Sequence, residues 1–201
     1  MNIKGKKVTL RAMTRDDMQL ICDMFNDPEL EDVVVGWAFP LSIEQQNRWF
    51  DNSLSSNGLN HRFVIETDEE GAIGIATLTD IDWKNRTAMH GIKLANKQIR
   101  TKGIGTDTVM AIMRYAFDEL GLHRLDGCWF DSNAASKRLY TKCGWKEEGV
   151  RRECIYKHGV WRDLTMVGVL DSDYKKLIEV NQYWDNSDQQ TLNSTMGGVN
   201  S

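Results

Sequence analysis

Two glycines and two cations stand close together in the middle of the chain, in the segment Arg100-Thr-Lys102-Gly103-Ile-Gly105-Thr. Because glycine has no side chain, the backbone at Gly103 and Gly105 can approach a ligand closely. The segment precedes an apolar helical stripe, and the unpaired N–H groups and dipole of a helix start favour a bound anion. Arg100 and Lys102 would add positive charge. This pattern predicts a phosphate-binding loop whose natural ligand is a pyrophosphate.

Other interpretations of this loop have to be weighed. The dinucleotide-binding fingerprint fails at its third glycine, where this chain has Thr108. A P-loop fails because no Gly-Lys-Ser/Thr follows a four-residue gap. Two glycines between a strand and a helix can also form only a tight turn. The ligand-binding interpretation is favoured by a second motif.

That second motif follows about thirty residues later, in Asn133-Ala-Ala-Ser136-Lys-Arg-Leu-Tyr140-Thr-Lys-Cys-Gly144-Trp. It resembles the pattern N-x-x-S-x-x-L-Y-x-x-x-G-F/W of the GNAT N-acetyltransferase superfamily. In the same way, Arg100-x-x-Gly-x-Gly after a strand resembles the acyl-CoA pyrophosphate loop of that superfamily. Both motifs occur in the expected order and at the expected separation.

Two further stretches resemble the RimJ/RimL and spermidine-acetyltransferase branch of the superfamily. They are Leu10-Arg-Ala leading into Asn26-Asp-Pro-Glu29, and Tyr156-Lys-His-Gly-Val-Trp-Arg-Asp163. The resemblance covers about residues 8–170. It implies an α/β fold with a mixed, mostly antiparallel sheet of six to seven strands, flanked by about four helices. The sheet would splay open between its fourth and fifth strands, residues 87–94 and 122–130, where acetyl-CoA would insert.

The resemblance also implies which residues contact acetyl-CoA. They lie on the fourth strand, on the glycine loop and on the helix of the second motif. We expect them to be Ile92, Lys93, Leu94, Arg100, Thr101, Lys102, Gly103, Ile104, Gly105, Thr106, Asn133, Ser136 and Tyr140.

The implied reaction moves an acetyl group from acetyl-CoA to a primary amine. It needs donors for the developing oxyanion, a proton for the leaving thiolate and a base for the ammonium. The resemblance implies backbone N–H groups of residues 91–94 as the donors and Tyr140 as the acid, since a phenol with a pKa of about 10 keeps its proton at neutral pH. Tyr140 could instead be only a core residue. Cys128 and Cys143 lack an evident activating partner, so direct attack is favoured over an acyl-cysteine route.

The sequence leaves the base open. Many relatives carry a glutamate at the position of Met89, which cannot accept a proton. His90 is adjacent and is our candidate for a catalytic role, although side chains alternate along a strand and His90 would face the other way. His90 could also be a satisfied core residue, and Glu66, Asp80, Asp131 and the segment Asp27–Asp32 are other candidates for the base. A water chain, or an amine that arrives neutral, would need no dedicated base.

An acidic run is the candidate acceptor site. We expect Glu29, Glu31, Asp32, Trp37 and Asp131 to bind the substrate, and the acids could attract a polyamine or a basic N-terminal peptide. The run could equally be a solvated helix end and loop.

Three functions therefore stand. The first is a RimJ/RimL-like transferase that acts on a protein N-terminus or a small-molecule amine. The second is a polyamine (spermidine or spermine) N-acetyltransferase. The third is a non-catalytic acetyl-CoA sensor, which Met89 favours and Tyr140 opposes.

The elements that must position these residues follow from hydrophobic periodicity. Asn26-Asp-Pro28 should end the first helix, because proline disfavours helix before it, and an irregular stretch should run to Pro40. We expect one domain over residues 1–182 and a disordered tail over residues 183–201, which are rich in polar residues. Strands are predicted over residues 8–13, 62–67, 73–81, 87–94, 122–130, 145–156 and 160–169, and helices over 14–25, 42–50, 109–120, 134–142 and 171–180.

Composition excludes several classes of protein. The 201 residues carry a formal net charge of -4, which disfavours nucleic acid as a partner. The four cysteines and four histidines show no metal-ligand spacing, so we expect no metal. We find no apolar run long enough for a membrane span or a signal sequence, and expect a cytoplasmic protein with no membrane partner. The apolar last hairpin could mediate a homodimer.

Overall fold

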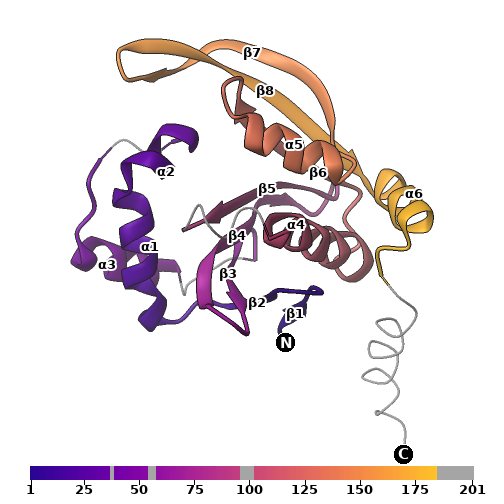
Figure 1. Cartoon of the computed structure of the whole chain (residues 1–201), viewed down its shortest axis with the longest axis horizontal. Helices are drawn as coiled ribbons and strands as arrows, with labels where there is room; N and C mark the ends of the chain where they lie inside the picture. The colour runs from indigo at the N-terminus through magenta and orange to yellow at the C-terminus, as the bar shows by residue number, and fades with distance from the viewer. Residues whose placement is uncertain (37–38, 54–57, 96–101, 185–201) are drawn as a thin grey trace, which may run out of the picture.

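Figure 1 shows a computed structural model of the chain, which describes residues 1–36, 39–53, 58–95 and 102–184. Its strands are β1 (Ile3–Lys4), β2 (Thr9–Ala12), β3 (His61–Thr67), β4 (Gly71–Asp82), β5 (Thr87–Leu94), β6 (Arg124–Phe130), β7 (Lys146–Lys157) and β8 (Val160–Leu170). Its α-helices are α1 (Met18–Asn26), α2 (Pro28–Val33), α3 (Ile43–Ser53), α4 (Ile104–Arg114), α5 (Ala134–Lys142) and α6 (Asp171–Asn181). A 3₁₀ turn (Arg15–Asp17) precedes α1, and a π-helical turn (Tyr115–Glu119) continues α4.

The strands of the described residues form one sheet in the order β1-β2-β3-β4-β5-β6-β8-β7. Every neighbouring pair is antiparallel except β5 and β6, which run parallel. The predicted α/β fold with a mostly antiparallel sheet is therefore confirmed. The predicted number of strands is too low, because Ile3–Lys4 adds an eighth by pairing with Leu10 and Thr9. A two-residue strand is too short to show a period in the sequence.

The sheet opens where it was expected to open. β5 and β6 pair only from Thr87 opposite Arg124 to Met89 opposite Asp126. Beyond that point β5 stays with β4, while β6 continues along β8 as far as Phe130. Beyond Met89, no strand of the described residues pairs with this side of β5, and we call it the free edge of β5.

Two apolar clusters hold the layers together. The larger one joins one face of the sheet to α4, whose residues Val109, Ala111, Ile112 and Met113 are fully buried. The smaller one joins Ile75 on the opposite face to α1, α2 and α3. Figure 1 shows α1, α2 and α3 grouped together, away from α4, and the hairpin β7–β8 extending past α5. The two faces of β5 therefore meet different helices.

The segment predicted to be irregular contains a helix. The Asp27 side chain accepts hydrogen bonds from the backbone N–H groups of Glu29 at 2.9 Å and Leu30 at 3.4 Å, and Pro28 takes the first helical position. Proline is tolerated there because its missing N–H would be unpaired in any case. Asn26-Asp-Pro28 thus ends α1 and also begins α2, a helix that periodicity did not predict. In the part of the chain that the structure describes, no helix is long and apolar enough to cross a membrane.

Two residues beyond the predicted domain boundary at residue 182 pack against the domain. Tyr183 donates a hydrogen bond to Asp107 of α4 at 2.8 Å. Trp184 is buried, donates to the Tyr174 hydroxyl at 2.9 Å and stacks against the Arg114 guanidinium at 3.8 Å. Because the residues that follow are mostly polar, the sequence analysis grouped Tyr183 and Trp184 with the tail. The rest of the expected tail, residues 185–201, lies outside the described residues.

Candidate functional site

A cleft of about 380 Å³ lies at the free edge of β5. It is bounded by the end of β5, the start of α4, one face of α5 and the end of α2. Many of the residues predicted from the glycine loop and the second motif meet here, although they come from three separate segments. Those that line the cleft are Ile92, Lys93, Leu94, Gly103, Gly105, Thr106, Asn133 and Ser136.

The start of α4 forms one end of the cleft. Gly103 is the N-cap of α4 and has a φ of 81°, a left-handed conformation that favours glycine. A Cβ atom on Gly105 would lie 3.3 Å from Cδ2 of Leu139, so the absence of a side chain lets α5 pack closely. The N–H groups of this helix start can bind an anion, as the sequence predicted.

The helix α5 forms the opposite wall and is held by Asn133. The Asn133 Oδ1 atom accepts the Ser136 N–H at 3.0 Å and caps α5, while its Nδ2 donates to the Val33 carbonyl of α2 at 3.3 Å. One side chain therefore fixes both the start of α5 and its position against α2.

Sequence reasoning missed several residues of this cleft. Arg138 and Lys142, four residues apart on α5, add two cations to its lining. Leu30, Val33 and Val34 add an apolar wall, because α2 was not predicted as a helix. The four-residue spacing of Arg138 and Lys142 within the second motif would have been the signal, since it puts both on one helix face.

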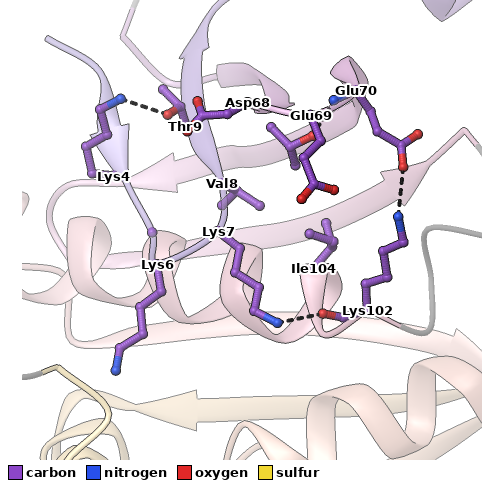
Figure 2. A pocket seen from close by; sticks show the side chains of 12 residues that line it. Lys4, Lys6, Lys7, Val8, Thr9, Asp68, Glu69, Glu70, Lys102 and Ile104 are labelled. Carbon is purple, nitrogen blue, oxygen red and sulfur yellow. Dashed lines mark hydrogen bonds and ion pairs between the residues drawn. The ribbon is translucent and has the colours of Figure 1, made fainter.

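Lys102 does not line this cleft. Its ammonium forms an ion pair with Glu70 at 3.1 Å, and its carbonyl accepts a hydrogen bond from Lys7 Nζ at 2.9 Å. Figure 2 shows both contacts in a second pocket, of about 450 Å³, which Ile104 also lines. Lys102 therefore turns away from the anion-binding end of α4. Arg100 and Thr101 lie outside the described residues.

An aromatic cluster surrounds Tyr140, next to the cleft. The Tyr140 ring lies 4.9 Å from Trp145 and 5.8 Å from both Trp129 and His90, measured between ring centroids. Tyr140 is buried, and burial raises the pKa of its phenol well above the ordinary value of 10. The phenol therefore stays protonated at neutral pH and can donate its proton.

His90 belongs to the same cluster. It is buried, and burial lowers its pKa to about 4. Its Nδ1 atom lies 3.0 Å from the Thr77 carbonyl, and because a carbonyl only accepts, Nδ1 carries the proton. Nε2 is then an acceptor, and it has no hydrogen-bond partner among the described residues. His90 and Tyr140 are thus brought together as neighbours.

The predicted acceptor residues are not brought together as free acids. Glu31 pairs with Lys157 at 2.9 Å and with His158 at 3.1 Å, and Asp32 lies 3.6 Å from His158. The turn of the β7–β8 hairpin therefore holds both carboxylates, which the sequence could not show. Asp131 is exposed and accepts the Ser132 N–H at 2.8 Å.

Glu29 is exposed at the start of α2. Trp37 lies outside the described residues. The carboxylates of Glu31 and Asp32 are thus paired with the hairpin in this structure, and their role in binding the acceptor stays a prediction.

The geometry of the cleft suits a long ligand with anionic groups at one end. Phosphates would be bound at the start of α4, near Arg138 and Lys142, and a slender apolar portion would fit between α2 and α5. The free edge of β5 offers backbone groups to a carbonyl, and Tyr140 offers a proton. This combination is what transfer of an acyl group from a phosphate-bearing carrier requires.

Comparisons with known proteins agree with this chemistry. The family model described as "Acetyltransferase (GNAT) domain" matches residues 7–146. Bacillus subtilis "Probable N-acetyltransferase YjcK" is 34% identical over 159 residues, covering 66% of this chain and 87% of that protein. Vibrio cholerae "Spermidine N(1)-acetyltransferase" is 26% identical over 170 residues, covering 85% and 96%. A crystal structure of a Vibrio cholerae spermidine N-acetyltransferase with CoA and spermine aligns with a TM-score of 0.77 at 25% identity, covering 84% of this chain and 98% of that chain.

Proposed function

The chain belongs to the GNAT acetyltransferase family and is an acetyl-CoA-dependent N-acetyltransferase, and we propose that it acetylates a primary amine of a small molecule or a protein N-terminus by direct attack. The observation that supports this best is the cleft at the free edge of β5, with the anion-binding start of α4 at one end. Within the family, we propose that the chain is RimJ/RimL-like.

The residues of the cleft fit acetyl-CoA. Gly103, Gly105 and Thr106 would hold the pyrophosphate through backbone N–H groups, and Arg138 and Lys142 would neutralise phosphate charge. Acetyl-CoA supplies the activated thioester. The backbone N–H groups of β5 beyond Met89 would donate to the thioester oxygen, because β6 no longer pairs with β5 there.

We assign Tyr140 as the acid that protonates the thiolate, because it keeps its proton and lies on the helix that lines the cleft. His90 remains the second candidate for a catalytic role. Its neutral Nε2 atom can accept a hydrogen bond, and its ring contacts Tyr140. This contact supports a role beside the acid.

A polyamine is the second candidate acceptor. It is supported by the Vibrio cholerae relative named as a spermidine N(1)-acetyltransferase. The acids Glu31 and Asp32, which would attract a polycation, already face Lys157 and His158. The primary proposal therefore leaves the amine class broader.

Self-association through the last hairpin is part of the proposal. β7 is an edge strand of the sheet, and Val150, Tyr156, Val160 and Trp161 of the hairpin expose between 50% and 62% of their surface. A structure of the Vibrio cholerae relative is described as dodecameric. Light scattering of the full chain would show whether it forms a homodimer.

The proposed function is tested by thiol release from acetyl-CoA across a panel of amines. Spermidine, spermine, N-terminal peptides, free amino acids and aminoglycosides make up the panel. Tyr140→Phe should lower kcat by about 10²–10⁴ while acetyl-CoA affinity is kept, because a positioned acid contributes that much. Tyr156→Phe, on the exposed hairpin, is the matched control and should keep its activity. Full turnover by Tyr140→Phe would remove Tyr140 from the mechanism, and no turnover with any amine would refute the proposed function.

A further inference from the structure

The C-terminal end of α2 is bound from across the open part of the sheet. α2 packs its apolar side chains with α1 and α3 in the smaller cluster, together with Ile75 of β4. The hairpin β7–β8 and the loop before α5 belong to the other half of the sheet, which is built on β6. Beyond Met89, no strand pairing among the described residues joins β5 to β6. In Figure 1 the free end of the hairpin lies on the same side of the molecule as α2.

Lys157, the last residue of β7, makes the central contact with α2. Its ammonium donates to the Val34 carbonyl at 3.0 Å and to the Glu31 carbonyl, and it forms an ion pair with the Glu31 carboxylate at 2.9 Å. These three acceptors match the three donors of an ammonium. The Lys157 side chain is only 7% exposed, and its Nζ lies 5.5 Å from the centroid of the buried Phe130 ring. Because a buried charge needs its partners, this contact favours one position of α2.

Two more side chains support this contact. Asn133 donates to the Val33 carbonyl at 3.3 Å, and His158 lies 3.1 Å from the Glu31 carboxylate. The carbonyl groups of residues 31, 33 and 34 therefore all accept hydrogen bonds from the other half of the molecule. The last carbonyl groups of a helix lack acceptor-to-donor pairs within the helix, so these bonds satisfy them and also fix where the helix lies.

The same stretch of α2 forms a wall of the acetyl-CoA cleft. Leu30, Val33 and Val34 line the cleft together with Leu139 of α5. Lys157 binds the main chain on both sides of Val33, at residues 31 and 34. A shift of this end of α2 relative to the hairpin would therefore displace the apolar wall from a ligand in the cleft.

We propose that Lys157 is a positioning residue for acetyl-CoA, because it binds the end of α2 and so keeps the apolar wall of the cleft in contact with the cofactor. We call the form in which Lys157 binds the α2 carbonyls the docked form. This inference rests on the proposed acetyl-CoA cleft and adds to it a residue that acts through α2. If the cofactor binds only the docked form, its apparent Kd rises as the docked fraction falls.

The test measures the affinity for acetyl-CoA by isothermal titration calorimetry in the wild type and two variants. Lys157→Met keeps the length of the side chain and removes the ammonium, whereas Lys157→Gln keeps two donors. We expect Lys157→Met to raise Kd about tenfold or more, which is the size of one hydrogen bond to a charged group, and Lys157→Gln to raise it less. The kcat at saturating acetyl-CoA should stay within about threefold of the wild type, since bound cofactor favours the docked form.

Two control variants separate this role from a loss of charge or of stability. Lys175→Met removes an exposed ammonium that pairs with Asp171 at 3.2 Å, and it should keep the wild-type Kd. Val169→Ala opens a cavity beside Leu125, where β5 and β6 are still paired. It should lower the urea midpoint and leave Kd unchanged.

Hydrogen exchange tests the docked form directly. In Lys157→Met the backbone amides of residues 30–34 should exchange faster than in the wild type, and saturating CoA should slow their exchange in both proteins. The measurement on the wild type needs no variant, so it decides the question even if a variant does not fold.

Each outcome decides a different statement. An unchanged Kd or unchanged exchange in Lys157→Met would overturn this inference and leave the acetyltransferase function standing. The same conclusion would follow from an equal rise in Kd in Val169→Ala, or from wild-type amides of residues 30–34 that CoA does not protect. A wild type that binds no acetyl-CoA would instead refute the proposed cleft itself.

Discussion

Replacing Asp107 with asparagine should destabilise the protein and weaken acetyl-CoA binding together. Asp107 is buried near the start of α4, and both of its oxygens are used. Oδ1 accepts the Lys6 N–H at 2.9 Å and the Tyr183 hydroxyl at 2.8 Å. Oδ2 accepts the Lys7 N–H at 2.6 Å and the Val8 N–H at 3.0 Å. One carboxylate thus fastens residues 6–8 and Tyr183 to α4, the helix whose first turn is our proposed site for the pyrophosphate.

The size of the effect follows from these four bonds. An asparagine keeps one acceptor oxygen and presents an NH₂ group to the donors that faced the other. One or two donors then lose their acceptor, at about 1–3 kcal/mol each. Since the Tyr183 hydroxyl can rotate to accept from the new NH₂ group, we expect a loss of about 2–4 kcal/mol in the free energy of unfolding. That is a large share of the stability of an ordinary domain.

Urea unfolding measures this loss as a lower midpoint at an unchanged m-value. Tyr183→Phe removes a single bond and should cost about 1.5 kcal/mol. Asp118→Asn is the matched control, because Asp118 accepts a long hydrogen bond from the Tyr174 hydroxyl at 3.4 Å, and it should change stability by less than about 0.5 kcal/mol.

Acetyl-CoA KM should rise in Asp107→Asn, because Lys7 next to Asp107 holds the Lys102 carbonyl beside Gly103. A stability loss no larger than that of the Asp118→Asn control would refute the argument that the four hydrogen bonds of Asp107 stabilise the protein. Gly5→Ala gives a second check, since its Cβ atom would overlap Oδ2 of Asp107. It should destabilise the wild type more than the Asp107→Asn variant, in which some of the hydrogen bonds of residue 107 are already lost.

Two further predictions concern His90 and the cations of α5. Burial lowers the pKa of His90 to about 4 in the folded state, so as pH falls the unfolded chain takes up that proton first. The contribution of neutral His90 to the free energy of unfolding should be complete above about pH 6.5 and should fall by up to about 3 kcal/mol toward pH 4. His90→Gln should remove this dependence of the unfolding free energy on pH, measured by urea unfolding. The same pH dependence in both proteins would contradict the burial argument. Arg138→Gln and Lys142→Gln should each raise KM for acetyl-CoA about two- to fivefold at low salt, and the double variant should show a weaker salt dependence than the wild type. An unchanged KM in both would remove them from the phosphate site.

The sequence predicted the parts of the site that depend on local patterns. The glycines at the start of α4 and the cap at Asn133 act through neighbours a few residues away, so their roles are visible in the sequence. The pairing of Glu31 with Lys157 depends on how the hairpin folds back over α2, and no local pattern records it. For that reason the sequence could not show that Glu31 and Asp32 meet Lys157 and His158.

A second difference from the prediction came from residues that are compatible with two local structures. Proline stops a helix that precedes it and begins one that follows it, and Asp27-Pro28 does both. Arg138 and Lys142 were missed because they occupy variable positions of the second motif, and the prediction used only its fixed positions. Their spacing was present in the sequence.

The alternation of β5 bears on where the proton acceptor for the amine can lie. His90 faces Tyr140 and Trp145, while Lys93 and Met89 face α1 and α3 on the other side of the strand. An acceptor that approached from the side of Met89 would have the strand between its amine and the His90 ring. His90 would then contact Tyr140 rather than the amine, and Met89 provides no basic side chain at the position where the family resemblance implies a glutamate. The amine must therefore reach the thioester in its neutral form or lose its proton to water. An acceptor amine of lower pKa, such as a peptide α-amine with a pKa of about 7.7–8.0, suits such a site better than a polyamine, because far more of it is neutral at pH 7.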